Sequence, residues 1–261
     1  MFHKPTTIFI RLLIILPLLL ALGCAGDDER ENGLVNIFLV DAPGDFDQVW
    51  VEVLGVEITP SNGEVVMLDY IPADKMVNVS ALVADNALLV GRGRVPVGEI
   101  VQMSLILGDE MYVKTQGERE DMQYASPENR RVDFNPGFNL LGGVSYDFYI
   151  DIDLAQSVSK IGAAYFFNPV ARTFSNINRG TLSGNVRPVE AFPHIYAISE
   201  EDTLTTLINQ EGNYTFRGLN QGTYEIRIQP RHPFLDTLFT VPIRVDTLNV
   251  APNIQLRRPA A

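Results

Sequence analysis

Apolar and polar side chains alternate along residues 48–58 (QVWVEVLGVEI), with the two-residue period of a β-strand. The valines share one face of this segment, whereas Trp50 and Glu52 share the other. The phase changes at Leu54–Gly55, where the glycine indicates a β-bulge. Most other apolar segments are also short, and no strong helical period follows the N-terminal region. The chain is therefore predicted to be all-β.

Turn signals divide the first part of the chain into strands. Residues 61–63 (SNG) predict a hairpin turn. Residues 88–95 and 100–107 predict a second hairpin, closed by the turn at Pro96–Gly98. Residues 76–84 fit a short helix, and the polar residues 108–135 predict a long loop. Further core strands are expected at residues 34–40, 144–152 and 163–167.

A second group of short strands begins near Arg179. Gly212 and Gly222 separate alternating segments, and the aromatic residues between them share a face. Short, evenly spaced strands of this kind predict a small β-sandwich. We therefore expect two β-sandwich domains in tandem, at residues 33–176 and 179–258.

Residues 1–23 have the features of a secretory signal peptide. Lys4 and Arg11 make the start basic, and the uncharged apolar run at 12–22 is shorter than the about 20 residues that span a bilayer. The following Ala21-Leu22-Gly23-Cys24 resembles the lipobox of bacterial lipoproteins, although Ala21 and Leu22 depart from its usual pattern. The resemblance implies cleavage before Cys24 and acylation of this residue.

Cys24 is the only cysteine, so its lipidation would exclude disulfides and thiol chemistry in the mature chain. Its acyl chains would hold the protein to a lipid bilayer. Residues 24–32 then form an acidic tether, and the cluster from Asp27 to Glu29 resembles a surface-export signal. Ala25 does not suggest retention at the inner membrane. The expected location is the bacterial outer membrane, on its periplasmic or its cell-surface side.

The charge of the chain excludes one class of partner. The net charge is −12, and it becomes −14 when Lys4 and Arg11 leave with the signal peptide. Proteins that bind nucleic acids need a positive surface to neutralise phosphates. Nucleic acid is therefore not an expected partner.

Three segments carry a resemblance to a known family over about residues 34–174. LVDAPGDFDQVWVEVLGVEI, VPVGEIVQMSLILGD, and VSYDFYIDIDLAQSV with AAYFFNPVAR are similar to successive blocks of the bacterial domain-of-unknown-function family 4382. Ile100, Ser104 and Asn168 depart from the residues usual in that family. The resemblance implies a secreted β-domain, often found on lipoproteins, and brings no known activity.

The segment EGNYTFRGLNQGTYEIRI resembles carboxypeptidase regulatory-like domains, which have a transthyretin-like sandwich. The resemblance covers residues 180–256, and Glu211 replaces the usual Asp. Its glycines and aromatic residues are mainly structural. The same fold group contains carbohydrate-binding modules, but a fold alone does not give a function.

The residues of common catalytic sites are sparse. Only His194 and His232 remain after the signal peptide, each beside a proline, and isolated histidines of this kind are typical of turns and surfaces. The sequence contains no HExxH or GxSxG motif and no phosphate-binding loop before a helix. We therefore predict that the protein is not an enzyme and needs no cofactor.

Acidic residues form the most notable polar group. They are Asp41, Asp45 and Asp47 in the loop DAPGDFD, and Asp151 and Asp153 on a later strand. Ca²⁺ prefers six to eight oxygen ligands, of which either group would supply some. The simpler interpretation is that these carboxylates cap turns and end a strand, because the loop lacks the full EF-hand spacing.

Aromatic side chains suggest a second type of site. Trp50 lies on the face opposite the valines, and either packs in the core of a two-sheet sandwich or stacks on a sugar ring. Core packing is the simpler interpretation. Tyr224 offers a similar ring in the second domain.

The leading hypothesis is thus a non-catalytic lipoprotein with a binding, adhesion or assembly role, whose partner is a glycan or an envelope protein. The alternatives are a carbohydrate-binding surface protein and an accessory or weak hydrolase.

Overall fold

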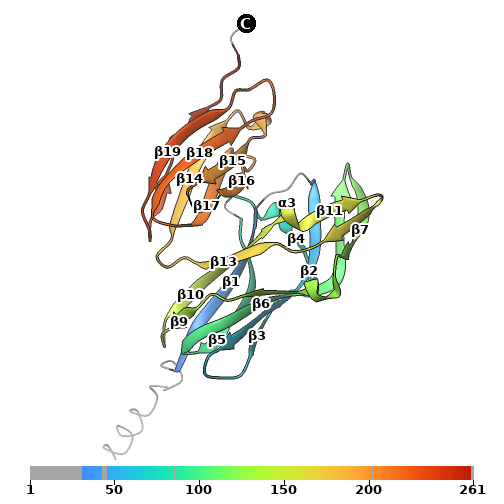
Figure 1. Ribbon diagram of the computed structural model, residues 1–261, viewed down its shortest axis with the longest axis vertical. Helices are drawn as coiled ribbons and strands as arrows, with labels where there is room; N and C mark the ends of the chain where they lie inside the picture. The colour runs from blue at the N-terminus through green and yellow to red at the C-terminus, as the bar shows by residue number, and fades with distance from the viewer. Residues whose placement is uncertain (1–30, 43–45, 85, 201–202, 260–261) are drawn as a thin grey trace, which may run out of the picture.

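The computed structural model describes residues 31–42, 46–84, 86–200 and 203–259. Nearly all of its regular elements are β-strands, which form two units with separate hydrophobic cores (Figure 1). The all-β prediction is therefore confirmed. The signal peptide, Cys24 and most of the acidic tether lie outside the described residues. In the described ranges, no helix is long and apolar enough to cross a membrane.

The first unit contains a four-stranded sheet and a nine-stranded sheet. In the smaller sheet, β1 and β10 run parallel at the centre, between β5 and β13. The larger sheet has the order β11-β12-β7-β6-β2-β3, while β4 also pairs with β2, and β8 and β9 with β6. The elements are β1 (Asn32–Ala42), β2 (Gln48–Pro60), β3 (Val66–Asp69), β4 (Met76–Asn78), η1 (Val79–Ala81), β5 (Leu88–Pro96), β6 (Gly98–Thr115), β7 (Glu118–Tyr124), η2 (Pro127–Arg130), β8 (Arg131–Phe134), β9 (Phe138–Leu140), β10 (Ser145–Asp153), α3 (Leu154–Ser157), β11 (Val158–Ile161), β12 (Ala164–Phe167) and β13 (Ala171–Ser175).

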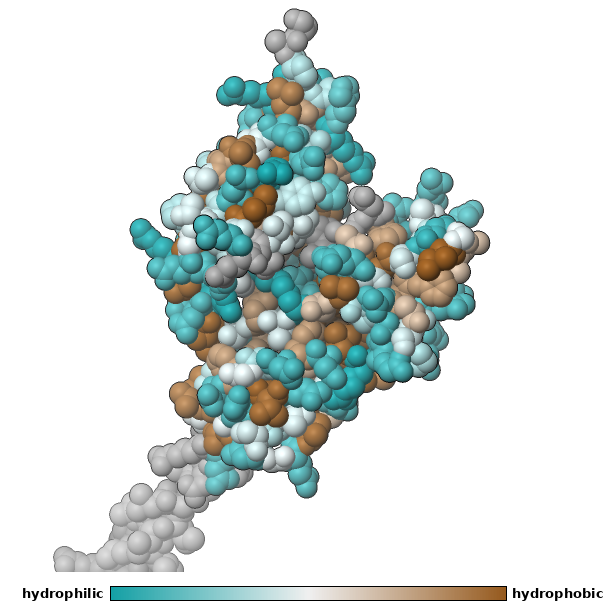
Figure 2. Space-filling view, in the orientation of Figure 1, coloured by the Kyte–Doolittle hydropathy of each residue, from teal (hydrophilic) through white to brown (hydrophobic). Residues whose placement is uncertain are grey.

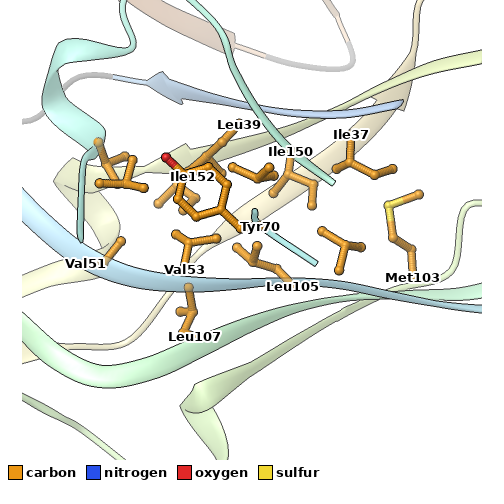
Figure 3. Packing of buried hydrophobic residues seen from close by; sticks show 14 of the residues in the cluster. Ile37, Leu39, Val51, Val53, Tyr70, Met103, Leu105, Leu107, Ile150 and Ile152 are labelled. Atoms are coloured by element: carbon orange, nitrogen blue, oxygen red, sulfur yellow. The ribbon is translucent and has the colours of Figure 1, made fainter. Parts of the chain in front are cut away.

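Both sheets contribute one face to a single core (Figure 3). The valines that alternate along β2 are fully buried there, which is the physical reason for the two-residue period. The other face of β2 points away from this core. Burial of these side chains stabilises the unit by roughly 1.5–3 kcal/mol for each large aliphatic residue. The core includes Ile37, Leu39, Val51, Val53, Leu105, Leu107, Ile150 and Ile152.

The predicted bulge and first hairpin are confirmed. The register of β2 against β6 shifts between Val51 and Val53 and again before Gly55. Gly55 has a φ of 152°, and a Cβ at this position would lie 2.4 Å from the carbonyl oxygen of Leu68. The pairing of β3 with β2 therefore leaves no room for a side chain at this position. Residues 61–63 lie in the turn between these two antiparallel strands.

Two other predictions were wrong. β5 and β6 do not form a hairpin, because β5 pairs with β1 in the smaller sheet and β6 belongs to the larger one. Residues 108–135 are not a long loop, because they contain the end of β6, β7, η2 and β8. Their inward side chains, such as Met111 and Met122, are buried, whereas the outward ones are mostly polar. At residues 76–84, the structure has the short strand β4 followed by one 3-10 turn, η1.

The second unit is a smaller sandwich of two four-stranded sheets. One sheet has the order β17-β14-β20, with β21 also on β14, and the other has the order β16-β15-β18-β19. Tyr214 and Phe216 on β17 are both buried in the core between them. The elements are β14 (Gly180–Arg187), η3 (Val189–Ala191), β15 (His194–Ile198), β16 (Thr203–Leu207), β17 (Asn213–Leu219), β18 (Gly222–Gln229), β19 (Thr237–Ile243), β20 (Leu248–Val250) and β21 (Ile254–Gln255).

Candidate binding surfaces

Figure 2 shows hydrophobic residues in small groups between hydrophilic ones, so hydropathy alone does not mark a site on this face. The position of the aromatic side chains is more informative. Trp50 lies on the outer face of β2 and is partly exposed, while its neighbours Val49 and Val51 are fully buried. The core-packing interpretation of Trp50 was therefore wrong.

A ladder of paired strands places other side chains beside Trp50. Trp50 is opposite Tyr112 on β6, and Tyr112 is opposite Asp121 on β7. The rings of Trp50 and Tyr112 lie 5.8 Å apart between centroids, at an angle of 16°. The Arg119 guanidinium lies 4.1 Å from the Tyr112 centroid, in the range of a cation–π contact. We call Trp50, Tyr112 and Arg119 the aromatic strip.

Polar side chains hold and border the aromatic strip. The indole Nε1–H of Trp50 donates to Oε1 of Gln48 at 2.9 Å. The Nε of Arg119 lies 2.9 Å from Oδ1 of Asp121. Asn78 of β4 is the other cross-strand neighbour of Trp50. Aromatic rings are therefore held on a three-stranded section of sheet, surrounded by amides and charges.

This arrangement suits a ligand that has both an apolar face and hydroxyl groups. Ring faces and edges contact C–H groups, while amide and charged side chains form directional hydrogen bonds. Sites on strands are held more exactly than sites on loops, because sheet hydrogen bonds fix their geometry. Sequence reasoning missed Tyr112 and Arg119, which fell in the supposed loop. The alternation of buried Met111 and Val113 around Tyr112 was the signal for a strand.

The ring of Tyr224 is not available to a ligand. Only 3% of this residue is exposed, because it points into the core of the second unit. Its hydroxyl accepts a hydrogen bond from the backbone N–H of Asn220 at 3.1 Å. The prediction that Tyr224 stacks on a sugar was therefore wrong. β18 alternates as expected, but Tyr224 occupies its inward face.

Asp41 is buried near the end of β1, on the face of the strand that points into the core, and it lies next to the junction between the units. Neither of its carboxylate oxygens has a hydrogen-bond partner among the described residues. Burial raises the pKa of Asp41 well above its usual range, and the nearby carboxylates of Asp151 and Asp153 raise it further. The backbone N–H of Leu154 offsets only part of this rise, without closing a hydrogen bond of ordinary geometry.

The other predicted acidic ligands have separate roles. Oδ2 of Asp47 accepts the backbone N–H of Gln116 at 2.7 Å. Asp153 is the N-cap of α3 and accepts the N–H of Gln156 at 3.0 Å. Asp151 binds Arg172. Asp45 lies outside the described residues. Within the described ranges, no three His, Cys, Asp or Glu side chains form a group that could hold a metal ion.

The two units meet through side chains of β13 and β17. Nη2 of Arg172 lies 3.4 Å from the carbonyl oxygen of Arg217, and Nη1 of Arg217 donates to the carbonyl of Ala84 at 2.6 Å. The backbone at Gly218 lies so close to Phe174 that a Cβ would be 2.5 Å from its ring. A cavity of about 30 Å³ beside Asp41 has room for a water molecule. The junction is therefore packed and hydrogen-bonded.

A family model described as "Domain of unknown function (DUF4382)" matches residues 32–169. The chain belongs to this family. The DUF4382 match includes β1 to β12, and hence the aromatic strip and Asp41. It ends before β13, which contributes Arg172 and Phe174 to the junction. No curated protein matches the chain.

Solved structures similar to this chain are distant. The Bacillus anthracis TIE protein is 11% identical with a TM-score of 0.25, and the match covers 87% of this chain and 34% of that protein. The minor pilin GBS52 of Streptococcus agalactiae is 8% identical with a TM-score of 0.28, covering 87% of this chain and 97% of that one. BcpA, the major pilin subunit of Bacillus cereus, is 8% identical with a TM-score of 0.25, covering 88% and 71%. Likenesses this distant do not indicate what the DUF4382 protein binds.

Proposed function

We propose that the mature chain is a non-catalytic, lipid-anchored protein of the bacterial cell envelope that binds a glycan through the aromatic strip. The observation that carries this proposal is the cross-strand pair Trp50–Tyr112 on the outer face of the larger sheet, with Arg119 over the tyrosine ring. Outward aromatic rings contribute nothing to the core of the unit. Their presence among hydrogen-bonding side chains favours a ligand with an apolar face and many hydroxyl groups.

Binding would follow from the side chains at the strip. A pyranose ring would place its C–H groups against the indole of Trp50, and its hydroxyls would reach Asn78 or Asp121. The contact of Tyr112 with both Trp50 and Arg119 fixes the rings before the ligand arrives. Prearranged side chains lose little conformational entropy on binding, which favours affinity.

The remaining parts of the chain would place this surface at the envelope. Lipid on Cys24 would attach the protein to the outer membrane, as proposed from the lipobox-like sequence. The second unit, which we propose to be a carboxypeptidase regulatory-like domain, would support the DUF4382 unit through the packed junction. A C24S variant tests the anchor, because it would leave the membrane fraction and lack the mass of the acyl chains.

A non-catalytic role agrees with the positions of the two histidines in the second unit. His194 is half-buried in β15, and His232 is exposed in the turn after β18. The cross-strand neighbours of His194 are Gln229 on β18 and Leu207 on β16, and neither side chain is an acid or a base. A screen of esterase, glycosidase and peptidase substrates with the purified protein is expected to give no turnover that depends on either histidine.

Glycan binding is tested with the full-length protein in detergent micelles on an array of bacterial and plant polysaccharides. We expect W50A to weaken binding of any captured glycan at least tenfold, about 1.4 kcal/mol. W50F should keep part of the affinity. The matched control is Y196A, which removes a partly exposed aromatic residue from a strand of the second unit. Equal loss in both variants, or capture of no glycan, would overturn the proposal in favour of an envelope protein as partner.

A further inference from the structure

A second surface lies between the units and shares no lining residue with the aromatic strip. A groove of about 470 Å³ lies between the segment just before β2 and the part of the second sandwich that includes the start of β15 and the end of β16. Its volume is in the range of small-ligand sites, which occur preferentially between domains. The first unit contributes Phe46 and Asp47, and the second contributes Phe192, Ile208 and Arg231 among others.

Phe192 has an unusual backbone and an unusual environment. It has a φ of 42° and a ψ of 56°, the left-handed region that bulky residues rarely adopt. Two backbone hydrogen bonds hold it there. The N–H of Phe192 donates to the carbonyl oxygen of Val189 at 3.1 Å, and the N–H of Arg231 donates to the carbonyl oxygen of Ala191 at 2.8 Å. Yet 57% of the residue is exposed, so the strained position does not serve to bury the ring. Strain that persists without burial is typical of binding sites.

Arg231 gives this ring a positive charge. Its guanidinium lies 5.1 Å from the Phe192 centroid. In the described ranges its guanidinium makes no side-chain hydrogen bond or ion pair, so its N–H groups can reach a ligand in the groove. The surrounding unit, residues 179–261, has eight Arg and eight Asp or Glu, so it has no net charge. The acidic excess of the chain therefore lies in the tether and the first unit, and Asp47 is the one carboxylate among the described residues that line the groove.

The opposite wall has complementary chemistry. Asp47 is exposed, and one of its oxygens is bonded to the N–H of Gln116, which ties this wall to the β6–β7 turn. A carboxylate only accepts hydrogen bonds, whereas a guanidinium only donates them. A ligand that fits both walls must donate hydrogen bonds on one side and present an anionic acceptor on the other. Between the walls, Phe46, Phe192 and Ile208 favour an apolar ring face.

We propose that this groove binds an acidic saccharide unit, with its carboxylate on Arg231, a ring face on Phe192 and hydroxyls on Asp47. An arginine guanidinium binds a carboxylate through two parallel hydrogen bonds. Arg231 would therefore be the main determinant of selectivity for an anionic ligand. This site goes beyond the proposed function, because it is separate from the aromatic strip and selects for a carboxylate. It requires both units in the arrangement that the junction holds.

Titration calorimetry of the full-length protein with oligogalacturonate tests this site, with the methyl-esterified oligomer and a neutral galactan for comparison. We expect binding of the acid form and at least tenfold weaker binding of the other two. R231Q should lose at least tenfold in affinity. R258Q is the matched control, because Arg258 stacks on Phe234 at 4.9 Å in the same unit but does not line the groove.

A second variant separates binding from folding. F192G removes the ring but suits the left-handed backbone, so it should fold at least as stably as the natural chain and still bind more weakly. W50A should leave this binding unchanged, which distinguishes the groove from the aromatic strip. The proposal is overturned if the ester binds as well as the acid, if R258Q loses as much as R231Q, or if oligogalacturonate and a peptide ending in a free carboxylate bind alike.

Discussion

Arg172 on β13 binds Asp151 on the neighbouring strand β10 and at the same time contacts the second unit. Its Nε and Nη2 lie 2.9 and 2.8 Å from Oδ2 of Asp151. Its Nη2 also lies 3.4 Å from the carbonyl oxygen of Arg217. One side chain therefore neutralises a carboxylate beside Asp41 and links the two sandwiches.

R172M should destabilise the protein, because it leaves the largely buried Asp151 without its cation. We expect the free energy of unfolding in urea to fall by roughly 1–3 kcal/mol, discounted for the part of Arg172 that is exposed. The matched control is R227M, whose pair with Glu225 is more exposed and should contribute roughly 0–1 kcal/mol. Equal losses would mean that Arg172 acts as an ordinary surface pair.

Asp41 should make stability depend on pH in the direction opposite to most carboxyl groups. Its pKa is raised in the folded protein, so the folded state binds the proton more tightly than the unfolded state. The stabilisation is complete below the unfolded pKa and is lost as the pH rises through the folded pKa. As the pH rises through this range, the free energy of unfolding of the natural chain should fall relative to that of D41N. The fall should be about 1.4 kcal/mol for each unit by which folding raises the pKa.

The measurement is urea unfolding of both proteins from pH 4 to pH 8. Titration of the other carboxyl groups cancels in the difference between the two curves, provided that the variant keeps the same fold. A difference that does not change with pH would mean that the pKa of Asp41 is not raised by folding, and would contradict the prediction.

Gly218 should be irreplaceable because of Phe174 and not only because of its backbone. It has a φ of 72°, and a Cβ there would lie 2.5 Å from the Phe174 ring. G218A should cost the left-handed strain of about 1 kcal/mol plus roughly 1–3 kcal/mol of overpacking. G162A is the control, since Gly162 has a φ of 64° with nothing within 4 Å. Thermal unfolding of the two variants provides the comparison. Similar losses of stability would mean that Phe174 moves at little cost to make room for the new methyl group.

Sequence patterns predicted what depends on neighbouring residues along the chain. The valines of β2 and the bulge at Gly55 could be predicted because alternation and its interruption are local properties. The pairing of β5 with β1 could not, because a short turn joins strands of one sheet or of two sheets equally well. For the same reason, the sequence did not predict that Tyr112 and Arg119 lie beside Trp50, because their strands are polar on the outward face.

The surfaces depend on contacts between distant segments, and the sequence predicted them only in part. Trp50 was recognised as a possible sugar contact, but its exposure follows from which face of β2 the smaller sheet covers. The sequence placed Asp41 in one group with Asp45 and Asp47 and placed Asp151 and Asp153 in another, whereas the structure brings Asp41 close to Asp151 and Asp153 and buries it at the junction with β16 and β17. The groove around Phe192 and Arg231 had no sequence signal, because it combines residues from both units and a backbone angle.

Tyr214 and Tyr224 should respond in opposite directions to removal of the hydroxyl group. The hydroxyl of Tyr214 is buried beside Gly184 without a partner among the described residues, and burial raises its pKa. The hydroxyl of Tyr224 accepts the N–H of Asn220. Since an unpaired buried polar group costs free energy and a paired one contributes it, Y214F should raise the free energy of unfolding by roughly 1 kcal/mol, and Y224F should lower it by roughly 1 kcal/mol. Urea unfolding of both variants at one pH provides the comparison, and a loss of stability in Y214F would mean that a buried water molecule satisfies the Tyr214 hydroxyl.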